Sequence, residues 1–139
     1  MSDAPPFSPT IMLLTLSRVW EAKLADGLKP LGLTTRQYGL LGHIRGTPGI
    51  SFSELARRSR ITVQSVHTAV ARFVTAGLVD DGTAHAGAAS TLSVTAEGAV
   101  VLDRASALVV DLDVEFAAQN PELTDALRVQ MMRALSSSE

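Results

Sequence analysis

The segment that most constrains the fold is "ITVQSVHTAVARFVTAGLV", which runs from Ile61 to Val79. At about 100° per residue, its apolar and polar side chains separate onto opposite sides of a helix. The apolar side holds Val66, Ala69, Val70, Phe73 and Val74. The opposite side holds hydrogen-bonding residues with no acid among them: Gln64, Ser65, His67, Thr68 and Arg72. The pattern predicts an amphipathic helix with one buried face and one polar face.

Three helices are expected before this segment. Thr10 is predicted to cap the first, which ends near Lys29. The spacing of its apolar residues suggests an inner stripe of Leu13, Leu16, Trp20, Leu24 and Leu28. Thr34 and Gln37 form a capping-box pattern at the start of a second helix, and "GTPG" at 46–49 ends it. The inner stripe of this second helix is Tyr38, Leu41 and Ile44.

A tight helix pair comes next. Ile50 and Ser51 fit a very short strand, and Ser53 is expected to cap a short third helix over "ELARRS". Arg60 and Ile61 form the turn, and Thr62 is placed to cap the fourth helix, which stops at Gly77.

A hairpin and two long helices follow. Strands are predicted at Leu78 and Val79 and at "TLSVT", with "DDGTAHAGAAS" as the tip between them. Thr95 is expected to cap a helix from Ala96 to about Ala118, and Asn120 with Pro121 starts the last helix. The inner faces expected here are Leu92 and Val94 in the strand, Val101, Ala105, Leu108, Leu112 and Phe116 in the long helix, and Leu123, Leu127, Met131 and Leu135 in the last.

Two helices joined by a tight turn and followed by a hairpin make a winged helix-turn-helix. The predicted fold is mainly α, with a small β-hairpin wing and with N- and C-terminal dimerisation helices. The chain resembles the MarR family of bacterial transcription regulators over nearly its whole length. The resemblance rests on "LGLTTRQYGLL", "SFSELARRSRITVQSVHTAVARFVTAGLV" and "LSVTAEG", in that order. It implies a single domain over 1–139, with dimerisation helices at 1–30 and 96–139 and a DNA-binding part at 34–95.

The charge is unevenly distributed along the chain. Its formal net charge is −2, but residues 36–72 hold six arginines against Glu54 alone, and residues 73–139 hold three arginines against ten acids. Positive charge therefore concentrates in the segment that contains the helix pair. This asymmetry favours a polyanionic partner for the middle of the chain.

The polar face of the fourth helix is the expected DNA-reading surface. A major groove accepts one helix, and residues near the N-terminus of that helix reach base edges. The base-reading candidates, which also match the family's positions, are Gln64, Ser65, His67 and Thr68. The phosphate-contact candidates are Arg36, Ser53, Arg57, Arg58, Arg60, Thr62 and Arg72. An ordinary solvated helix face is the alternative interpretation.

The wing departs from the family pattern. Hairpin tips in this family commonly carry arginines, one of which enters the minor groove, whereas the tip here has no Arg or Lys and two adjacent acids. His85 is its single candidate for a cation. This departure favours a second hypothesis, in which the chain is a winged-helix protein-interaction module with weak or lost DNA binding.

The resemblance also implies a homodimer on palindromic DNA, acting as a repressor that a small aromatic or phenolic acid releases. The terminal helices carry more apolar surface than one small domain can cover, which fits a two-fold dimer. The residues considered for the ligand pocket are Arg18, Trp20, Tyr38 and His43. An equally good interpretation makes Trp20 and Tyr38 core residues, Arg18 a surface charge and His43 an ordinary helix residue.

The composition argues against other classes. With 46% hydrophobic and 19% charged residues the chain is globular, and the absence of cysteine excludes disulfides and thiolate metal sites. The three histidines lie on separate predicted elements and show no metal-ligand spacing, so neither a metal, a cofactor nor an enzyme is expected. No apolar run approaches the roughly 20 residues that span a bilayer, so we expect a cytoplasmic protein with no membrane segment and no signal peptide.

Overall fold

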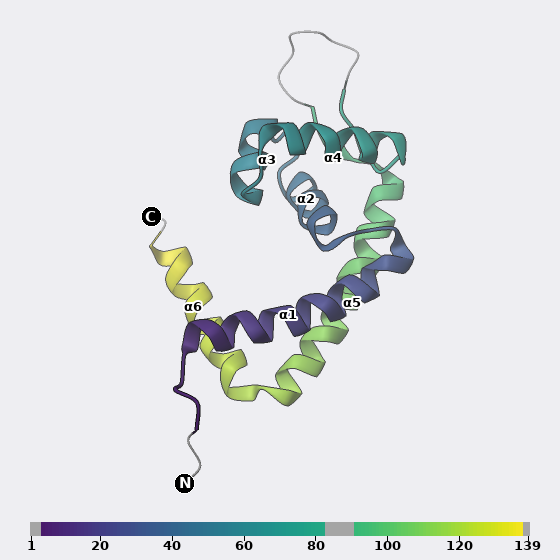
Figure 1. Cartoon of the computed structure of the whole chain (residues 1–139). Helices are drawn as coiled ribbons and strands as arrows, with labels where there is room; N and C mark the ends of the chain where they lie inside the picture. Colours follow the sequence, from purple (N-terminus) through teal and green to yellow (C-terminus); the bar gives the residue numbers. More distant parts are fainter. Residues whose placement is uncertain (1–3, 83–90, 138–139) are drawn as a thin grey trace.

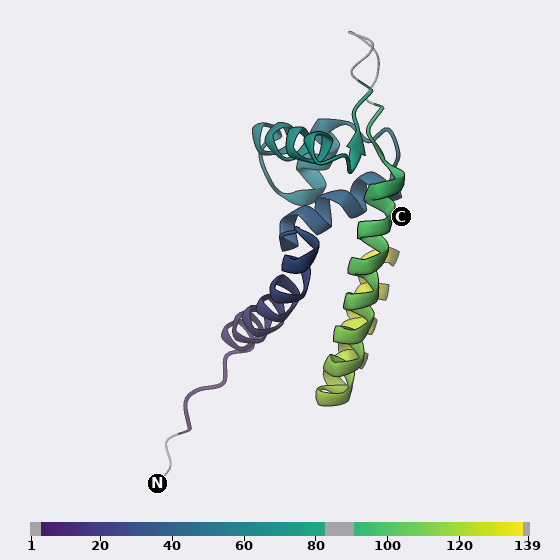
Figure 2. The same cartoon turned by 90° about the vertical axis from the view of Figure 1, so that its right-hand side faces the viewer.

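The computed structural model describes residues 4–82 and 91–137, and it has two visibly different parts (Figures 1 and 2). We call α2, α3, α4 and the β1–β2 hairpin the head, and α1, α5 and α6 the legs. Figure 2 shows the legs projecting from one side of the head, with α4 on the side away from them. The elements are α1 (Pro9–Leu28), a 3₁₀ turn η1 (Lys29–Leu31), α2 (Thr35–Gly46), α3 (Phe52–Ser59), α4 (Val63–Thr75), β1 (Val79–Asp80), β2 (Ser93–Val94), α5 (Ala96–Gln119) and α6 (Pro121–Ser136).

Three of the predicted helix caps are confirmed. Thr34 forms the capping box with Gln37: its hydroxyl accepts from the Gln37 N–H at 3.1 Å, and the Gln37 side chain accepts from the Thr34 N–H at 2.9 Å. Thr62 caps α4 by accepting from the Ser65 N–H, and Thr95 caps α5 by accepting from the Gly98 N–H. These caps fix where α2, α4 and α5 begin.

Two predicted caps are wrong by two residues each. α1 is capped by Ser8 rather than Thr10, because Pro9 has the φ of a first helical residue and no N–H that needs a partner. α3 is capped by Ser51, whose hydroxyl accepts from the Glu54 N–H at 3.1 Å, and Ser53 lies inside the first turn. Because Ser51 serves as this cap, the predicted short strand at residues 50–51 is also wrong.

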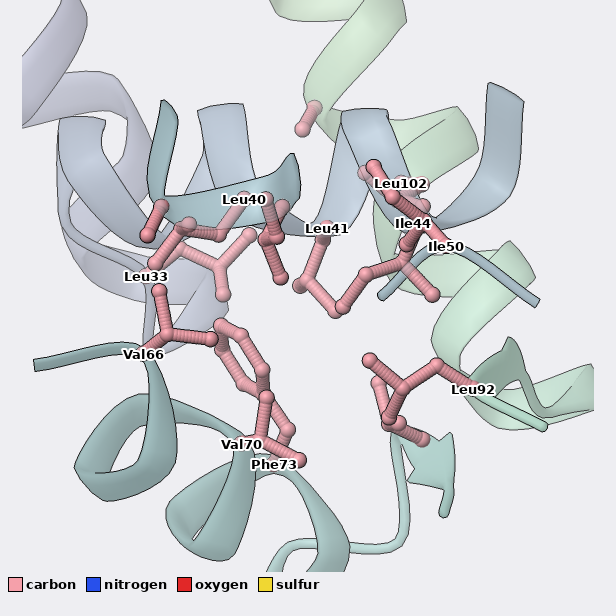
Figure 3. Close-up of a cluster of buried hydrophobic side chains, with 14 of the residues drawn as sticks. Leu33, Leu40, Leu41, Ile44, Ile50, Val66, Val70, Phe73, Leu92 and Leu102 are labelled. Atoms are coloured by element: carbon pink, nitrogen blue, oxygen red, sulfur yellow. The ribbon is translucent and has the colours of Figure 1, made fainter. Parts of the chain in front are cut away.

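The core lies within the head, between α2, α4 and the hairpin (Figure 3). Leu40, Leu41 and Ile44 of α2 face Val66, Val70 and Phe73 of α4, with Leu92 and Leu102 closing one end. All eight side chains are buried. The apolar face predicted for the fourth helix is thus confirmed, except that Val74 is 37% exposed.

The hairpin and the start of α5 join the head to the legs. β1 and β2 are antiparallel, with Val79 opposite Val94 and Asp80 opposite Ser93. The Thr95 hydroxyl donates to the Gly77 carbonyl at 2.6 Å. Gly98 is buried against the residue that precedes β1: a Cβ there would lie 2.2 Å from the Leu78 carbonyl oxygen. Glycine at this position lets α5 pack directly on the hairpin backbone.

The legs contact one another through α1 and α5. The Trp20 and Phe116 rings meet edge to face at a centroid distance of 4.9 Å, and Lys23 forms an ion pair with Glu115. α6 has no buried side chain in the single chain. The apolar stripes predicted to face inward on α1 and α6 are therefore partly exposed to solvent in the single chain. The exposed members are Leu13, Leu127, Met131 and Leu135, at 60%, 47%, 57% and 61%.

Candidate nucleic-acid interface

The outer face of α4 is open to solvent. Gln64, His67, Thr68 and Arg72 are exposed, and Ser65 is half-buried. Their backbone is held from below by the buried Val66, Val70 and Phe73. Because the same helix carries the core on its other side, these polar side chains lie on a rigid support.

Hydrogen bonds within α4 determine what two of these side chains can offer. The Thr62 hydroxyl donates to Ser65 Oγ at 2.9 Å, which ties Ser65 to the helix cap. The Thr68 hydroxyl donates to the Gln64 carbonyl at 3.1 Å. The Thr68 hydroxyl proton is therefore engaged within the helix, which leaves the methyl group and the oxygen lone pairs of this exposed residue for an outside partner. A methyl group suits contact with a thymine methyl.

His67 is held by a neighbour in α3. Its ring meets the Phe52 ring edge to face at a centroid distance of 4.4 Å. Such aromatic pairs favour defined orientations. Phe52 therefore restricts how the exposed His67 imidazole can turn.

A groove of about 350 Å³ separates the start of α2 from α4. Arg36 and Gln37 line one side of it, and Gln64, Thr68 and Arg72 line the other. The sequence placed these residues on separate helices, and the fold brings their side chains to one surface. Two arginines beside the base-reading candidates give this surface a positive charge.

The arginines of α3 are already paired. Arg57 and Arg58 both donate to the Glu54 carboxylate, and Arg58 also donates to Thr47 Oγ1 at 3.0 Å. The hydrogen bonds from Arg57 and then Arg58 lower the pKa of Glu54 to about 2, and the bond to Glu54 raises the pKa of Arg57. Sequence reasoning missed this cluster, although acid–base spacings of three and four residues on a helix are a known pairing signal.

The remaining phosphate candidates lie close to these elements. Arg60 ends α3 in the left-handed conformation, with φ of 55°, and its side chain is exposed. Ser53 is exposed in the first turn of α3, and Thr62 is exposed at the cap of α4. His85, proposed as the wing's cation, lies outside the described residues.

The structure does not bring the four ligand-pocket candidates into one hollow. Trp20 packs on Phe116 and Lys23, Tyr38 packs against the core, and Arg18 is exposed on α1. His43 instead lines a hollow of about 330 Å³ that also contains residues of α1, α3 and the turn after it. We call it the α2–α3 hollow; its polar lining is Glu21, Thr35, Arg36, His43, Ser59 and Arg60.

Two oxygen atoms in the lining of this hollow were not expected from the sequence. Thr35 Oγ1 and Ser59 Oγ are buried and have no hydrogen-bond partner. Buried polar atoms are normally paired, because leaving one unpaired costs about 1–3 kcal/mol. No local pattern marks these two residues, since their burial depends on how α2 and α3 pack.

Two other site classes find no support in residues 4–82 and 91–137. Within these ranges no group of three or more His, Cys, Asp or Glu residues is placed to hold a metal ion. None of the helices there is both long enough and apolar enough to cross a bilayer.

Comparison with known proteins gives a consistent result. The MarR family model matches residues 31–86, a range that includes α2, α3, α4 and β1. The chain is 29% identical over 109 residues to the HTH-type transcriptional repressor Rv2887 of Mycobacterium tuberculosis, covering 78% of each protein. Its fold is similar to the crystal structure of Rv2887 in complex with DNA, with a TM-score of 0.73, 27% identity and coverage of 96% and 98% of the two chains. It is also similar to the Rv2887 complex with salicylic acid, with a TM-score of 0.70, 26% identity and coverage of 97% and 99%.

Proposed function

We propose that the chain, which is similar to the MarR family over residues 31–86 and to the repressor Rv2887, is a MarR-type, sequence-specific transcriptional repressor that binds palindromic double-stranded DNA as a homodimer. The observation that carries the proposal is the exposed polar face of α4, held on a buried core and bordered by arginines. Its likeness to Rv2887, whose structure with DNA is known, supports the same conclusion.

We assign base reading to the first turns of α4. The Gln64 amide can form two hydrogen bonds with an adenine edge, and Ser65 and His67 can each contact several edges. Thr68 presents the methyl group that a thymine contact requires. These residues then determine sequence preference, whereas the arginines around them determine affinity for any duplex.

We assign phosphate contacts to Arg36 and Arg72 in the groove and to Arg60 at the turn. Ser53 and Thr62 are placed to contact the same DNA strands as neutral donors. Arg57 and Arg58 can join them while remaining bonded to Glu54, because each guanidinium has five N–H donors and Glu54 occupies only some of them. Each phosphate that is neutralised steepens the slope of the logarithm of the binding constant against the logarithm of the salt concentration by about 0.9.

The proposed dimer places two copies of α4 on one face of the DNA. The legs expose apolar residues along α1, α5 and α6, among them Ile11, Val114 and Met132. A second copy of the chain would bury this surface. Two reading helices about 34–36 Å apart then contact successive major grooves, which is why the operator is expected to be palindromic.

We further propose that a small aromatic acid releases the repressor from DNA, as the salicylic acid complex of Rv2887 suggests. The proposed site of action is the cytoplasm, and we assign the protein no catalytic role and no cofactor. Of the pocket residues predicted from the sequence, Arg18, Trp20 and Tyr38 remain candidates beside His43.

A gel-shift titration tests the proposal. The purified protein is titrated against the DNA upstream of its own gene and against random DNA of equal length, at two salt concentrations. The wild type should prefer the upstream DNA at both concentrations and bind it more weakly at the higher one. Gln64→Ala should reduce the preference by about 5- to 100-fold, because a good bidentate base contact contributes about 1–3 kcal/mol. Arg72→Gln should weaken binding to both DNAs alike. It should also lower the slope of log affinity against log salt concentration by about 1.

The competing function is a winged-helix module that acts through a protein partner. Two observations favour it: the hairpin tip lacks arginine, and Glu54 binds two of the head's arginines. Equal, salt-sensitive binding of upstream and random DNA by the wild type, unchanged in Gln64→Ala, would support this module and contradict the repressor.

A further inference from the structure

His67 differs from its neighbours on α4 in what holds its side chain. Ser65 and Thr68 are held by hydrogen bonds of 2.9 and 3.1 Å, and these bonds engage part of their polar capacity. The His67 imidazole is held by the Phe52 ring instead, and it takes part in no side-chain hydrogen bond in the part of the chain that the structure describes. The ring nitrogens of this exposed residue are therefore available to an outside partner.

Phe52 is itself fixed both at its backbone and at its side chain. It is the first residue of α3, directly after the cap that Ser51 forms with the Glu54 N–H. Its ring is half-buried and packs against the core of the head, to which Leu55 of the same helix also belongs. Phe52 is therefore a rigid support for the imidazole beside it.

The orientation of an imidazole decides what it offers to a base. A neutral ring has one N–H donor and one nitrogen acceptor, and a half-turn about the Cβ–Cγ bond exchanges each nitrogen with a carbon position. A base edge in the major groove has its donors and acceptors at fixed places, so a ring that has turned loses the contact. The Phe52 and His67 rings meet at a centroid distance of 4.4 Å and an interplanar angle of 64°, an edge-to-face arrangement that opposes such turning.

A ring that is held in advance also binds at a lower entropic cost. A mobile side chain that becomes fixed at an interface loses conformational freedom, and this loss opposes binding. The loss applies only where the side chain makes its contact, so it weakens binding to the matching base pair and not to a mismatched one. A held His67 therefore discriminates between bases better than a free one, although Phe52 itself is not required to touch DNA.

We propose that Phe52 is a positioning residue for base recognition, which holds the His67 imidazole in the orientation that reads one base pair in each half-site. This inference rests on the proposed repressor function and adds a residue of α3 to the determinants of sequence preference. The arginines of α3 then act on the phosphates of any duplex, whereas Phe52 acts on sequence preference through His67.

Proton NMR tests the ring contact on the protein without DNA. The ring current of Phe52 should displace the imidazole resonances of His67 from those of a freely exposed histidine, and His67→Ala assigns these resonances by their loss. Phe52→Leu keeps an apolar side chain but removes the ring, so it should return the resonances to the positions of a free histidine. Phe73→Leu is the matched control: it makes the same change at a buried core residue on the apolar side of α4 and should leave them in place.

Binding to altered operators tests the effect on recognition. The operator is located in the DNA upstream of the gene, each of its base pairs is changed singly, and discrimination is the ratio of the affinities for the original and the changed duplex. His67→Ala should lower discrimination about fivefold at one position in each half-site, because a hydrogen bond to that base is lost. Phe52→Leu should lower it about threefold at the same position, and it should leave the other positions and the affinity for random DNA unchanged.

Further variants separate positioning from a general loss of stability. Phe52→Tyr keeps the ring and should keep the wild-type discrimination. Phe73→Leu should lower the free energy of unfolding without changing discrimination at any single position. When Phe52→Leu and His67→Ala are combined, discrimination should be no lower than in His67→Ala alone, because Phe52 acts through His67.

The outcomes separate this inference from the proposed function. Failure of the wild type to prefer its upstream DNA would overturn the repressor, and base reading by His67 with it. A wild type with that preference, combined with unchanged discrimination in Phe52→Leu, would overturn the positioning role alone. The same conclusion would follow from a loss spread evenly over all operator positions, or from losses in the two single variants that multiply in the combined one.

Discussion

The head and the legs use apolar residues in opposite ways. In the head, the apolar residues of α2 and α4 meet across a closed core in which Leu40, Leu41 and Ile44 are at most 1% exposed. In the legs, α6 buries no side chain, and α1 buries Leu28 at its end nearest the head. The same 139-residue chain therefore contains a part whose apolar residues are mostly covered, with help from Leu28 of α1 and Leu102 of α5, and a part whose apolar residues are mostly open.

The difference shows why the helix pattern alone was a poor guide to burial. Apolar stripes occur in both parts, but the chain supplies a facing partner for the stripes of the head and for only part of the legs. The legs are therefore the region whose structure depends most on association. The following predictions test this contrast from the largest expected effect to the smallest.

Truncating the centre of the head should have the largest effect on stability. Leu41 is 0% exposed, so Leu41→Ala removes buried atoms and leaves a cavity. It should lower the free energy of unfolding by about 2–5 kcal/mol in a urea titration. The same truncation at Leu127, which is 47% exposed in α6, should cost much less in dilute protein. Equal losses would mean that the legs are as well packed within one chain as the head.

A charge on the legs should disrupt association rather than folding. Met131 is 57% exposed on α6, and a glutamate there would face the apolar surface of a second copy. Met131→Glu should shift the protein to monomers in sedimentation and weaken operator binding by about a hundredfold, or about 2.7 kcal/mol. The control Gln130→Glu adds the same charge on the same helix at an exposed polar position. A dimeric Met131→Glu protein would show that this face of α6 is not the interface.

Gly98 tests the junction between the two parts. A methyl group there would lie 2.2 Å from the Leu78 carbonyl oxygen, which is backbone and cannot turn aside. Gly98→Ala should therefore lower the free energy of unfolding by about 1–3 kcal/mol. Gly42→Ala is the matched control: a methyl group there would meet nothing within 4 Å, so the change should stabilise α2 by about 0.5–1 kcal/mol. Stabilisation by both changes would contradict the close approach of α5 to the hairpin.

Neutralising Glu54 should have a small effect, confined to DNA binding by the head. Glu54→Gln frees Arg57 and Arg58, so affinity for random DNA should rise about threefold with a steeper salt dependence. Because the pKa of Glu54 is lowered to about 2, this carboxylate stays charged from pH 8 down to pH 5 and loses its charge only as the pH falls towards 2. Its pairing with the arginines should therefore not vary with pH over that range. Glu122→Gln on α6 is the control. An equal rise in its affinity for random DNA would mean that the effect comes from net charge alone.

Local chemistry was the part of this structure that the sequence predicted well. The caps at Thr34, Thr62 and Thr95 depend on contacts three residues away, and all three are confirmed. The caps of α1 and α3 were misplaced because a second serine or threonine lay two residues from the true cap. The polar face of α4 was also predictable, since one helical repeat determines which side chains share it.

Tertiary packing decided the rest. The long helix was expected to bury a single stripe, but α5 turns Gly98, Leu102 and Ala105 to the head and its later residues to α1. The α2–α3 hollow combines Glu21, Thr35 and Ser59, which are far apart in the chain and carry no shared pattern. Residues of this kind can be found only once the relative positions of the helices are known.

The 20 residues of α1 have a mechanical consequence for the proposed dimer. At about 1.5 Å per residue this helix is a rod about 30 Å long, attached to the head at one end by η1. A tilt of about 5° at its free end moves the attached end by about 2.6 Å, which is most of the roughly 3.4 Å that separates neighbouring base pairs. In the proposed dimer, small adjustments where two copies meet would be magnified into shifts approaching one base-pair step, so the spacing of the half-sites would be set far from the residues that touch them.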